Sequence, residues 1–177
     1  MGIVCLLALG ACRQTATGKN GVTYHNPVEY NDYIVNRQSK LMQNILLFGK
    51  VANESIDSAE ALMRESVNQA GVMIHEIEGM PAYQGDSVLR NAAIRSFSFY
   101  KRVFGDEYMQ VLEIRRKGDA ATTDDIDRIN DIVKRIGDEE ETFDHEFKQA
   151  QEQFAKRFHM RLRENPMAPD VKKYNEQ

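Results

Sequence analysis

The chain has only two cysteines, Cys5 and Cys12, and none follows residue 12. The body of the protein therefore has no thiol for a disulfide, and its fold depends on packing even in an oxidising compartment. The same absence excludes cysteine-ligated zinc, iron–sulfur clusters, Cys-x-x-Cys redox chemistry and covalent haem attachment from that body.

Positive charge is not clustered into a stripe anywhere along the sequence. The net charge is −4 at pH 7, and acidic and basic residues are interleaved. Nucleic-acid binding needs clustered Lys and Arg side chains, so we expect no nucleic-acid partner. A membrane-spanning helix needs about 20 consecutive apolar residues, and the sequence has no such run.

Sequence motifs of common catalytic sites are absent as well. The chain has no Gly-x-Ser-x-Gly, no His-Glu-x-x-His and no glycine-rich loop that would bind phosphate. We therefore expect that the protein is not an enzyme, and we assign no catalytic residue.

The start of the chain does carry a recognisable signal. Residues 3–9 (IVCLLAL) have about the length of the apolar core of a secretory signal peptide. Gly10 and Ala11 then precede Cys12, which is the pattern that a bacterial lipoprotein signal peptidase requires. We predict a signal peptide at residues 1–11, acyl chains on Cys12, and an extracytoplasmic, membrane-anchored protein in the periplasm or at the cell surface.

One feature of a signal peptide is missing, because no Lys or Arg precedes the apolar run. A true start upstream of Met1 would account for this. The alternative is that residues 3–9 are a buried segment of the fold.

Composition divides the rest of the chain into three parts. Residues 12–25 comprise the predicted lipidated Cys12 and a stretch that lacks apolar periodicity, which is typical of a flexible tether. A flexible coil of this length spans about 20 Å. Residues 26–165 are predicted to form a helical bundle, and residues 166–177 a disordered tail.

Four amphipathic stripes predict an all-α fold. No stretch alternates with period two between turn signals, so we expect no sheet. Short connections favour an antiparallel four-helix bundle, with a long C-terminal helix of about 60 Å. Gly105 and Gly137 are positions at which a helix can kink. The predicted helices run from Asn26 to a weakened pattern at residues 52–55, from the capping box Asp57-x-x-Glu60 to Gly79, from Asp86 to Gly118, and from Thr122 to Asn165.

Two pairs of side chains have the chemistry of metal ligands. His75 and Glu78 lie three residues apart, and Glu141 and His145 lie one helical turn apart beside an acidic run. The Glu-x-x-His motif of di-iron bundles is absent. Since solvated side chains on outer helix faces have the same pattern, we assign no metal and no cofactor.

An aromatic seam is the other feature that could serve a ligand. Such a seam either lines a cavity or packs as a core. The methionines are scattered without a Met-x-x-Met cluster, which is typical of core filling. The seam consists of Phe97, Tyr100, Phe104 and Tyr108, with Phe143, Phe147 and Phe154 expected to face them.

The segment at residues 28–38 (VEYNDYIVNRQ), after the predicted lipidation site and tether, resembles a family of uncharacterised bacterial surface lipoproteins of the leptospiral type. The likeness covers the signal and the first helix, about a fifth of the chain. It implies a surface or periplasmic lipoprotein and brings no catalytic residues.

These observations together predict a lipid-anchored helical protein of the cell envelope that acts as a protein-binding or structural module. Its membrane contact would be made through Cys12, and its protein partner could be a second copy of the chain. The alternative is a carrier of a small ligand or metal, such as iron, copper or haem, that uses the aromatic seam or the His–Glu pairs.

Overall fold

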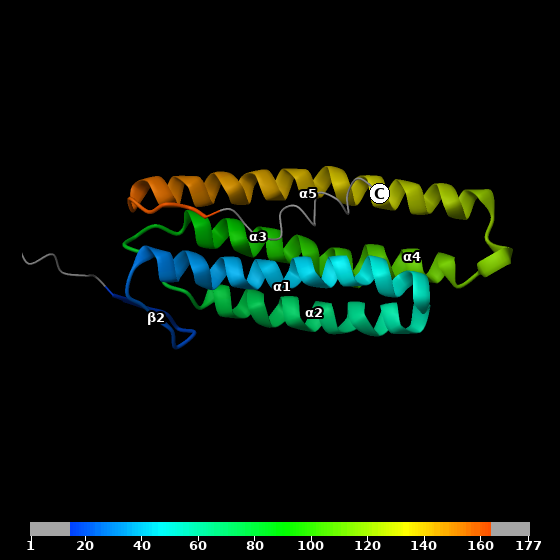
Figure 1. Cartoon of the computed structure of the whole chain (residues 1–177), viewed down its shortest axis with the longest axis horizontal. Helices are drawn as coiled ribbons and strands as arrows, with labels where there is room; N and C mark the ends of the chain where they lie inside the picture. The colour runs from blue at the N-terminus through cyan, green and yellow to red at the C-terminus, as the bar shows by residue number, and fades with distance from the viewer. Residues whose placement is uncertain (1–14, 164–177) are drawn as a thin grey trace, which may run out of the picture.

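The computed structural model describes residues 15–163. Figure 1 shows the long helices side by side along one axis, with the chain reversing direction between α1 and α2, between α2 and α3, and again before α5. Helix α2 contacts α1 and α3, and α3 contacts α5. The predicted all-α class is confirmed. The elements in chain order are β1 (Ala16–Thr17), β2 (Thr23–Tyr24), α1 (Pro27–Glu54), α2 (Ile56–Glu78), α3 (Val88–Arg102), a π-helical turn (Val103–Glu107), α4 (Tyr108–Arg115), a 3-10 turn (Gly118–Ala120) and α5 (Thr123–Arg157).

Two helices begin where their caps predict. The Asn26 side chain accepts a hydrogen bond from the Glu29 backbone N–H, and Pro27 occupies the first turn of α1. Thr122 and Asp125 form a reciprocal capping box at the start of α5. Local polar chemistry therefore sets both starts.

The first connection is shorter than predicted. Helix α1 continues through residues 52–54, and only Ser55 separates it from α2. The Ser55 hydroxyl caps α2 by accepting from the Ser58 backbone N–H at 3.2 Å. The prediction that a capping box at Asp57 starts this helix is wrong, because Ser55 has already satisfied the first turn.

The predicted third helix is interrupted by the π-helical turn at Val103–Glu107. Gly105 lies in this turn, where an added Cβ would come within 3.2 Å of Val67 on α2. A glycine here lets the turn approach α2 closely. Each π-helical turn shifts the register of the side chains that follow, so α3 and α4 are two helices joined in line.

Helix α5 is continuous through Gly137 and ends at Arg157. The prediction that it runs to Asn165 is wrong. His159 adopts a left-handed φ of 52°, and the Met160 backbone N–H donates to the Ala155 carbonyl at 3.0 Å. This hydrogen bond is typical of a Schellman motif, and it ends the helix upstream of the predicted stop at Pro166.

Residues 16–24 form an antiparallel hairpin against the helices. Tyr24 is 1% exposed, and the Asn20 backbone N–H donates to the Gly79 carbonyl at 3.2 Å. The predictions of a flexible tether and of no strand are wrong for residues 15–25. Cys12, the predicted signal and the predicted tail at residues 166–177 lie outside the described residues.

Candidate functional site

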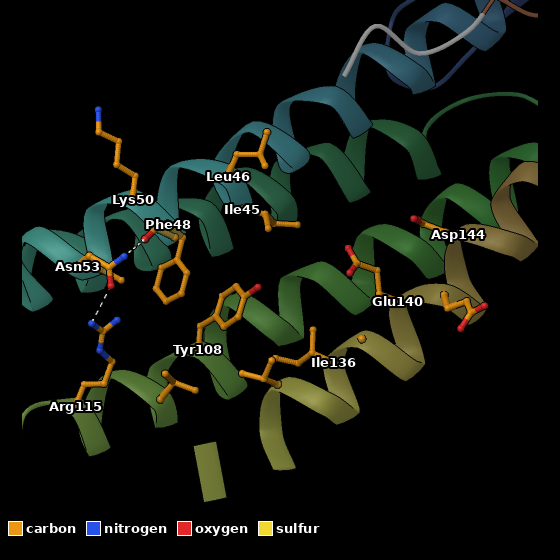
Figure 2. A pocket seen from close by; sticks show the side chains of 16 residues that line it. Ile45, Leu46, Phe48, Lys50, Asn53, Tyr108, Arg115, Ile136, Glu140 and Asp144 are labelled. Atoms are coloured by element: carbon orange, nitrogen blue, oxygen red, sulfur yellow. Dashed lines mark hydrogen bonds between the residues drawn. The ribbon is translucent and has the colours of Figure 1, made fainter. Parts of the chain in front are cut away.

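A groove of about 1090 Å³ lies between the second half of α1, α4 and the middle of α5 (Figure 2). At the hairpin end of the molecule α1 and α5 touch: Tyr30 stacks on Phe154 at 5.4 Å, and the Gln151 side-chain amide donates to Asn31 at 2.9 Å. The groove opens further along the same pair of helices. It is lined by Ile45, Leu46, Phe48, Gly49, Lys50, Ala52, Asn53, Tyr108, Val111, Arg115, Val133, Ile136, Gly137, Glu140, Glu141 and Asp144.

The floor of this groove is aromatic and aliphatic. The rings of Phe48 and Tyr108 stack at 4.3 Å between centroids with an interplanar angle of 11°. Ile45 and Ile136 are buried on either side. Tyr108 is the first residue of α4, directly after the π-helical turn, so the change of register at that turn sets the direction of its ring toward α1.

One edge of the groove is acidic. The Tyr100 hydroxyl donates to Glu140 at 3.0 Å and lies 3.4 Å from Asp144. Desolvation raises the pKa of both carboxyl groups, and the nearby Asp144 charge raises that of Glu140 further, while the hydrogen bond from Tyr100 acts in the opposite direction. Burial raises the pKa of the Tyr100 hydroxyl well above its usual value. Tyr100 is therefore a neutral donor that holds two carboxylates at the wall of the groove.

The far end of the groove carries positive charge. Arg115 on α4 donates to the Asn53 side-chain oxygen at 3.1 Å, which fixes the guanidinium at the end of α1 (Figure 2). Lys50 extends from α1 away from the floor. An elongated ligand in this groove would meet carboxylates at one end and a guanidinium at the other.

A second groove, of about 590 Å³, lies between α1 and α2 on a different face. Its walls are mainly polar, and the Arg37–Glu76 ion pair at 2.7 Å crosses it. Val72, which is 61% exposed, is one of its few apolar side chains. This groove offers little apolar surface to a partner.

The two predicted His–Glu pairs lie on different helices. His75 and Glu78 are exposed on α2. His145 is exposed on α5 and shares a hydrogen bond of 2.9 Å with Gln149, whereas Glu141 lines the apolar groove. Within residues 15–163, no three His, Cys, Asp or Glu side chains are grouped so that they could hold a metal ion. The structure does not bring the pairs together.

Most of the aromatic seam is packed core. Phe97, Tyr100 and Phe104 are at most 1% exposed, and Phe147 and Phe154 are buried on α5. Phe143 stacks on Phe99 instead of on the seam. Only the Tyr108 end of the seam reaches a groove.

The groove itself was not predicted from the sequence. Its one signal is Val133, which has the helical spacing of an apolar stripe with Ile129 and Ile136 but is 54% exposed. The neighbouring Ile132 is buried instead. The position of α1 relative to α5 decides which of these two side chains is covered.

No family model, curated protein or solved structure matches the chain. In the part of the chain that the structure describes, no helix has both the length and the apolar composition needed to cross a bilayer.

Proposed function

We propose that the protein is a lipid-anchored component of the bacterial cell envelope and that its helical body, an antiparallel four-helix bundle, binds a partner protein. The observation that carries the proposal is the groove between α1, α4 and α5, which combines an apolar floor with charge of opposite sign at its two ends. The proposal assigns no reaction and no cofactor to the protein.

The character of the groove favours a polypeptide over a small molecule. Its volume of about 1090 Å³ lies just above the range for small-molecule sites, about 300–1,000 Å³. Stacked aromatic side chains such as Phe48 and Tyr108 are typical centres of protein interfaces, with charged groups at the rim. The two charged ends would fix the direction of the bound segment.

The small-ligand or metal carrier receives less support. That alternative depended on the aromatic seam, whose side chains Phe97 and Phe104 are fully buried against their neighbours. The exposed His75 and His145 lie on separate helices. We therefore place the binding function in the groove.

The membrane anchor in this proposal rests on Gly10, Ala11 and Cys12 of the sequence. Several acyl chains on one cysteine would hold the protein firmly, whereas one chain gives only marginal binding. In a bacterium that processes lipoproteins, the wild-type protein should incorporate a fatty-acid probe and Cys12→Ala should not. Equal labelling of the two proteins would contradict the anchor.

A site-specific photo-crosslinker tests the groove in living cells. Val133 in the groove and Val72 in the second groove are similarly exposed, at 54% and 61%, so one serves as the matched control for the other. A crosslinking amino acid at position 133 should capture one defined protein that position 72 does not capture. The same pattern of products from both positions would refute the groove as the binding surface.

A further inference from the structure

We infer that residues 156–163, at the C-terminal end of α5, form a membrane contact that binds the phosphate groups of anionic lipids and holds the body with α5 pointing away from the bilayer. We call this segment the basic end. The contact is additional to the proposed acylation of Cys12 and does not depend on it. Three observations support it: the distribution of charge along α5, the position of the basic end beside the hairpin, and an exposed apolar side chain between two arginines.

Charge is divided along α5 and the residues that follow it. Residues 123–146 contain ten Asp or Glu and only three Lys or Arg. Residues 153–163 contain four Lys or Arg and no Asp or Glu. An anionic surface would therefore attract the C-terminal end of α5 and repel the rest of the helix, which favours one orientation of the body.

The helix dipole accounts for only part of this pattern. Lys156 and Arg157 lie in the last turn of α5, where cations stabilise a helix. The helix ends at Arg157, and His159 turns the chain with a φ of 52°. Arg161 and Arg163 are exposed beyond this turn, where the effect of the dipole has fallen off. These two arginines are therefore available to an external anion.

The basic end lies beside the hairpin at one end of the molecule (Figure 1). A row of aromatic rings connects the two: Tyr24 contacts Tyr30 at 5.1 Å, Tyr30 contacts Phe154 at 5.4 Å, and Phe154 contacts Phe158 at 4.7 Å. This packing holds the end of α5 in a fixed position relative to β2. A membrane that approaches the hairpin end would meet the basic end as well.

Part of the acidic charge at this end of the molecule is neutralised internally. Asp86 is 7% exposed and pairs with Arg157 at 2.9 Å. Glu29 accepts hydrogen bonds at the start of α1. Asp32 and Glu78 are exposed on α1 and α2, away from the segment after α5. The attraction for an anionic surface is therefore confined to the basic end.

Leu162 gives the basic end an apolar component. It is 38% exposed and lies between Arg161 and Arg163. Basic side chains combined with an exposed leucine are typical of surfaces that lie at the boundary between headgroups and acyl chains. An anionic lipid supplies a partner for both, whereas a free phosphate or a nucleic-acid backbone supplies only the charge. We therefore assign the contact to lipid.

Co-sedimentation with vesicles tests the contact. The parent protein is the full chain with Cys12→Ser, Leu6→Ser and Leu7→Ser, which removes the acylation site and interrupts the apolar run, so that binding reports on the body. The vesicles contain either equal parts of phosphatidylglycerol and phosphatidylcholine or phosphatidylcholine alone. Binding should be more than about tenfold tighter to the anionic vesicles and should weaken with added salt. Equal affinity for the two vesicles would overturn the inference.

Arg161→Gln with Arg163→Gln removes two cations from the basic end. Each Lys or Arg near an anionic surface strengthens binding about fivefold, so this variant should bind the anionic vesicles about 25-fold more weakly than the parent. The matched control is Lys134→Gln with Arg135→Gln, which removes the same charge from exposed positions in the acidic part of α5 and should leave binding unchanged. Equal weakening by the two pairs would overturn the inference, because net charge alone would then govern binding.

An indole at either end of α5 measures the orientation. The chain contains no tryptophan, so Leu162→Trp and Ile126→Trp each introduce a single indole, at positions that are 38% and 50% exposed. Ile126 lies 31 residues before Arg157 (157 − 126), or about 46 Å along the helix axis. A lipid with a quencher on its headgroup should quench the indole at position 162 and not the indole at position 126. Equal quenching at both positions would overturn the orientation.

Failure of this inference is distinguishable from failure of the proposed function. Fatty-acid labelling of Cys12 and photo-crosslinking from position 133 do not involve residues 156–163. If both of those experiments succeed while the body shows no preference for anionic vesicles, only the lipid contact of the basic end is refuted.

Discussion

Replacing Asn20 by Ala tests whether the hairpin is an integral part of the folded body. The Asn20 side-chain amide donates to the Tyr24 hydroxyl at 2.8 Å and to the Glu76 carbonyl at 3.0 Å. Its oxygen accepts from the Val22 backbone N–H at 3.1 Å. At a net value of about 1 kcal/mol for each bond, and with Asn20 only partly buried, the loss should be about 2–3 kcal/mol.

Urea unfolding followed by far-UV circular dichroism measures this loss. Lys19→Ala is the matched control, because Lys19 is the neighbouring residue and its side chain is exposed. The control should change the free energy of unfolding by less than about 0.5 kcal/mol. If Asn20→Ala changes it by as little as the control, the hairpin does not contribute to the stability of the body and the reasoning fails.

A double-mutant cycle separates the bond to Tyr24 from the other two. Tyr24→Phe removes the hydroxyl that accepts this bond from Asn20. The double variant should therefore lose about 1 kcal/mol less free energy of unfolding than the sum of the losses in the two single variants. Simple additivity would show that the Asn20–Tyr24 bond carries no net free energy.

Further substitutions in α5 and in the π-helical turn have defined outcomes. Gly137→Ala should raise the free energy of unfolding by about 1 kcal/mol, because an added Cβ in the middle of α5 meets nothing within 4 Å. Gly105→Ala should raise it less or lower it, because its Cβ would come within 3.2 Å of Val67 on α2. Glu107→Ala should cost about 2 kcal/mol in the same urea titration, because Glu107 is 4% exposed and pairs with Arg102, and Glu107→Gln should cost less. Asp144→Asn should lower the pKa of Glu140 measured by NMR titration. Burial raises the pKa of Glu140 above its usual 4.5 and the pKa of Asp144 above its usual 3.8. As the pH falls, the folded state therefore takes up protons before the unfolded state does. The two buried carboxylates therefore destabilise the folded state at neutral pH, and stability rises as they are protonated on acidification. Asp144→Asn should make this rise smaller. An unchanged dependence of stability on pH would contradict the raised pKa values.

The sequence was sufficient where structure depends on neighbouring residues. Asn26 with Pro27, and Thr122 with Asp125, begin α1 and α5 as predicted, because a cap satisfies backbone N–H groups within one turn. Gly79 follows the end of α2 as predicted, but the reason for a glycine there is not local: its φ is −71°, and an added Cβ would come within 2.8 Å of the Asn20 backbone nitrogen in the hairpin. Phe97 and Tyr100 of α3 also followed from helical periodicity alone, whereas the buried Phe99 did not.

The features that were missed depend on contacts between distant parts of the chain. The hairpin is held through Asn20 and the carbonyl of Glu76, which lies 56 residues away in sequence. The hydrophobic pattern of residues 15–25 gives no indication of such a contact. The π-helical turn depends on the close approach of Gly105 to Val67, and the groove depends on how far α1 and α5 separate beyond their contact at Asn31 and Gln151.

The hairpin also changes the distance at which the body would be held from a membrane. If Cys12 carries the lipid, only three residues separate it from Ala16, which is already paired with Tyr24, and the four steps from Cys12 to Ala16 span at most about 14 Å. Phe48 lies 21 residues along α1 from Pro27, or about 32 Å further along the helix axis (48 − 27). With the hairpin end nearest the lipid headgroups, α1 would act as a spacer that presents the groove well clear of the bilayer, where partners anchored elsewhere or in solution can reach it.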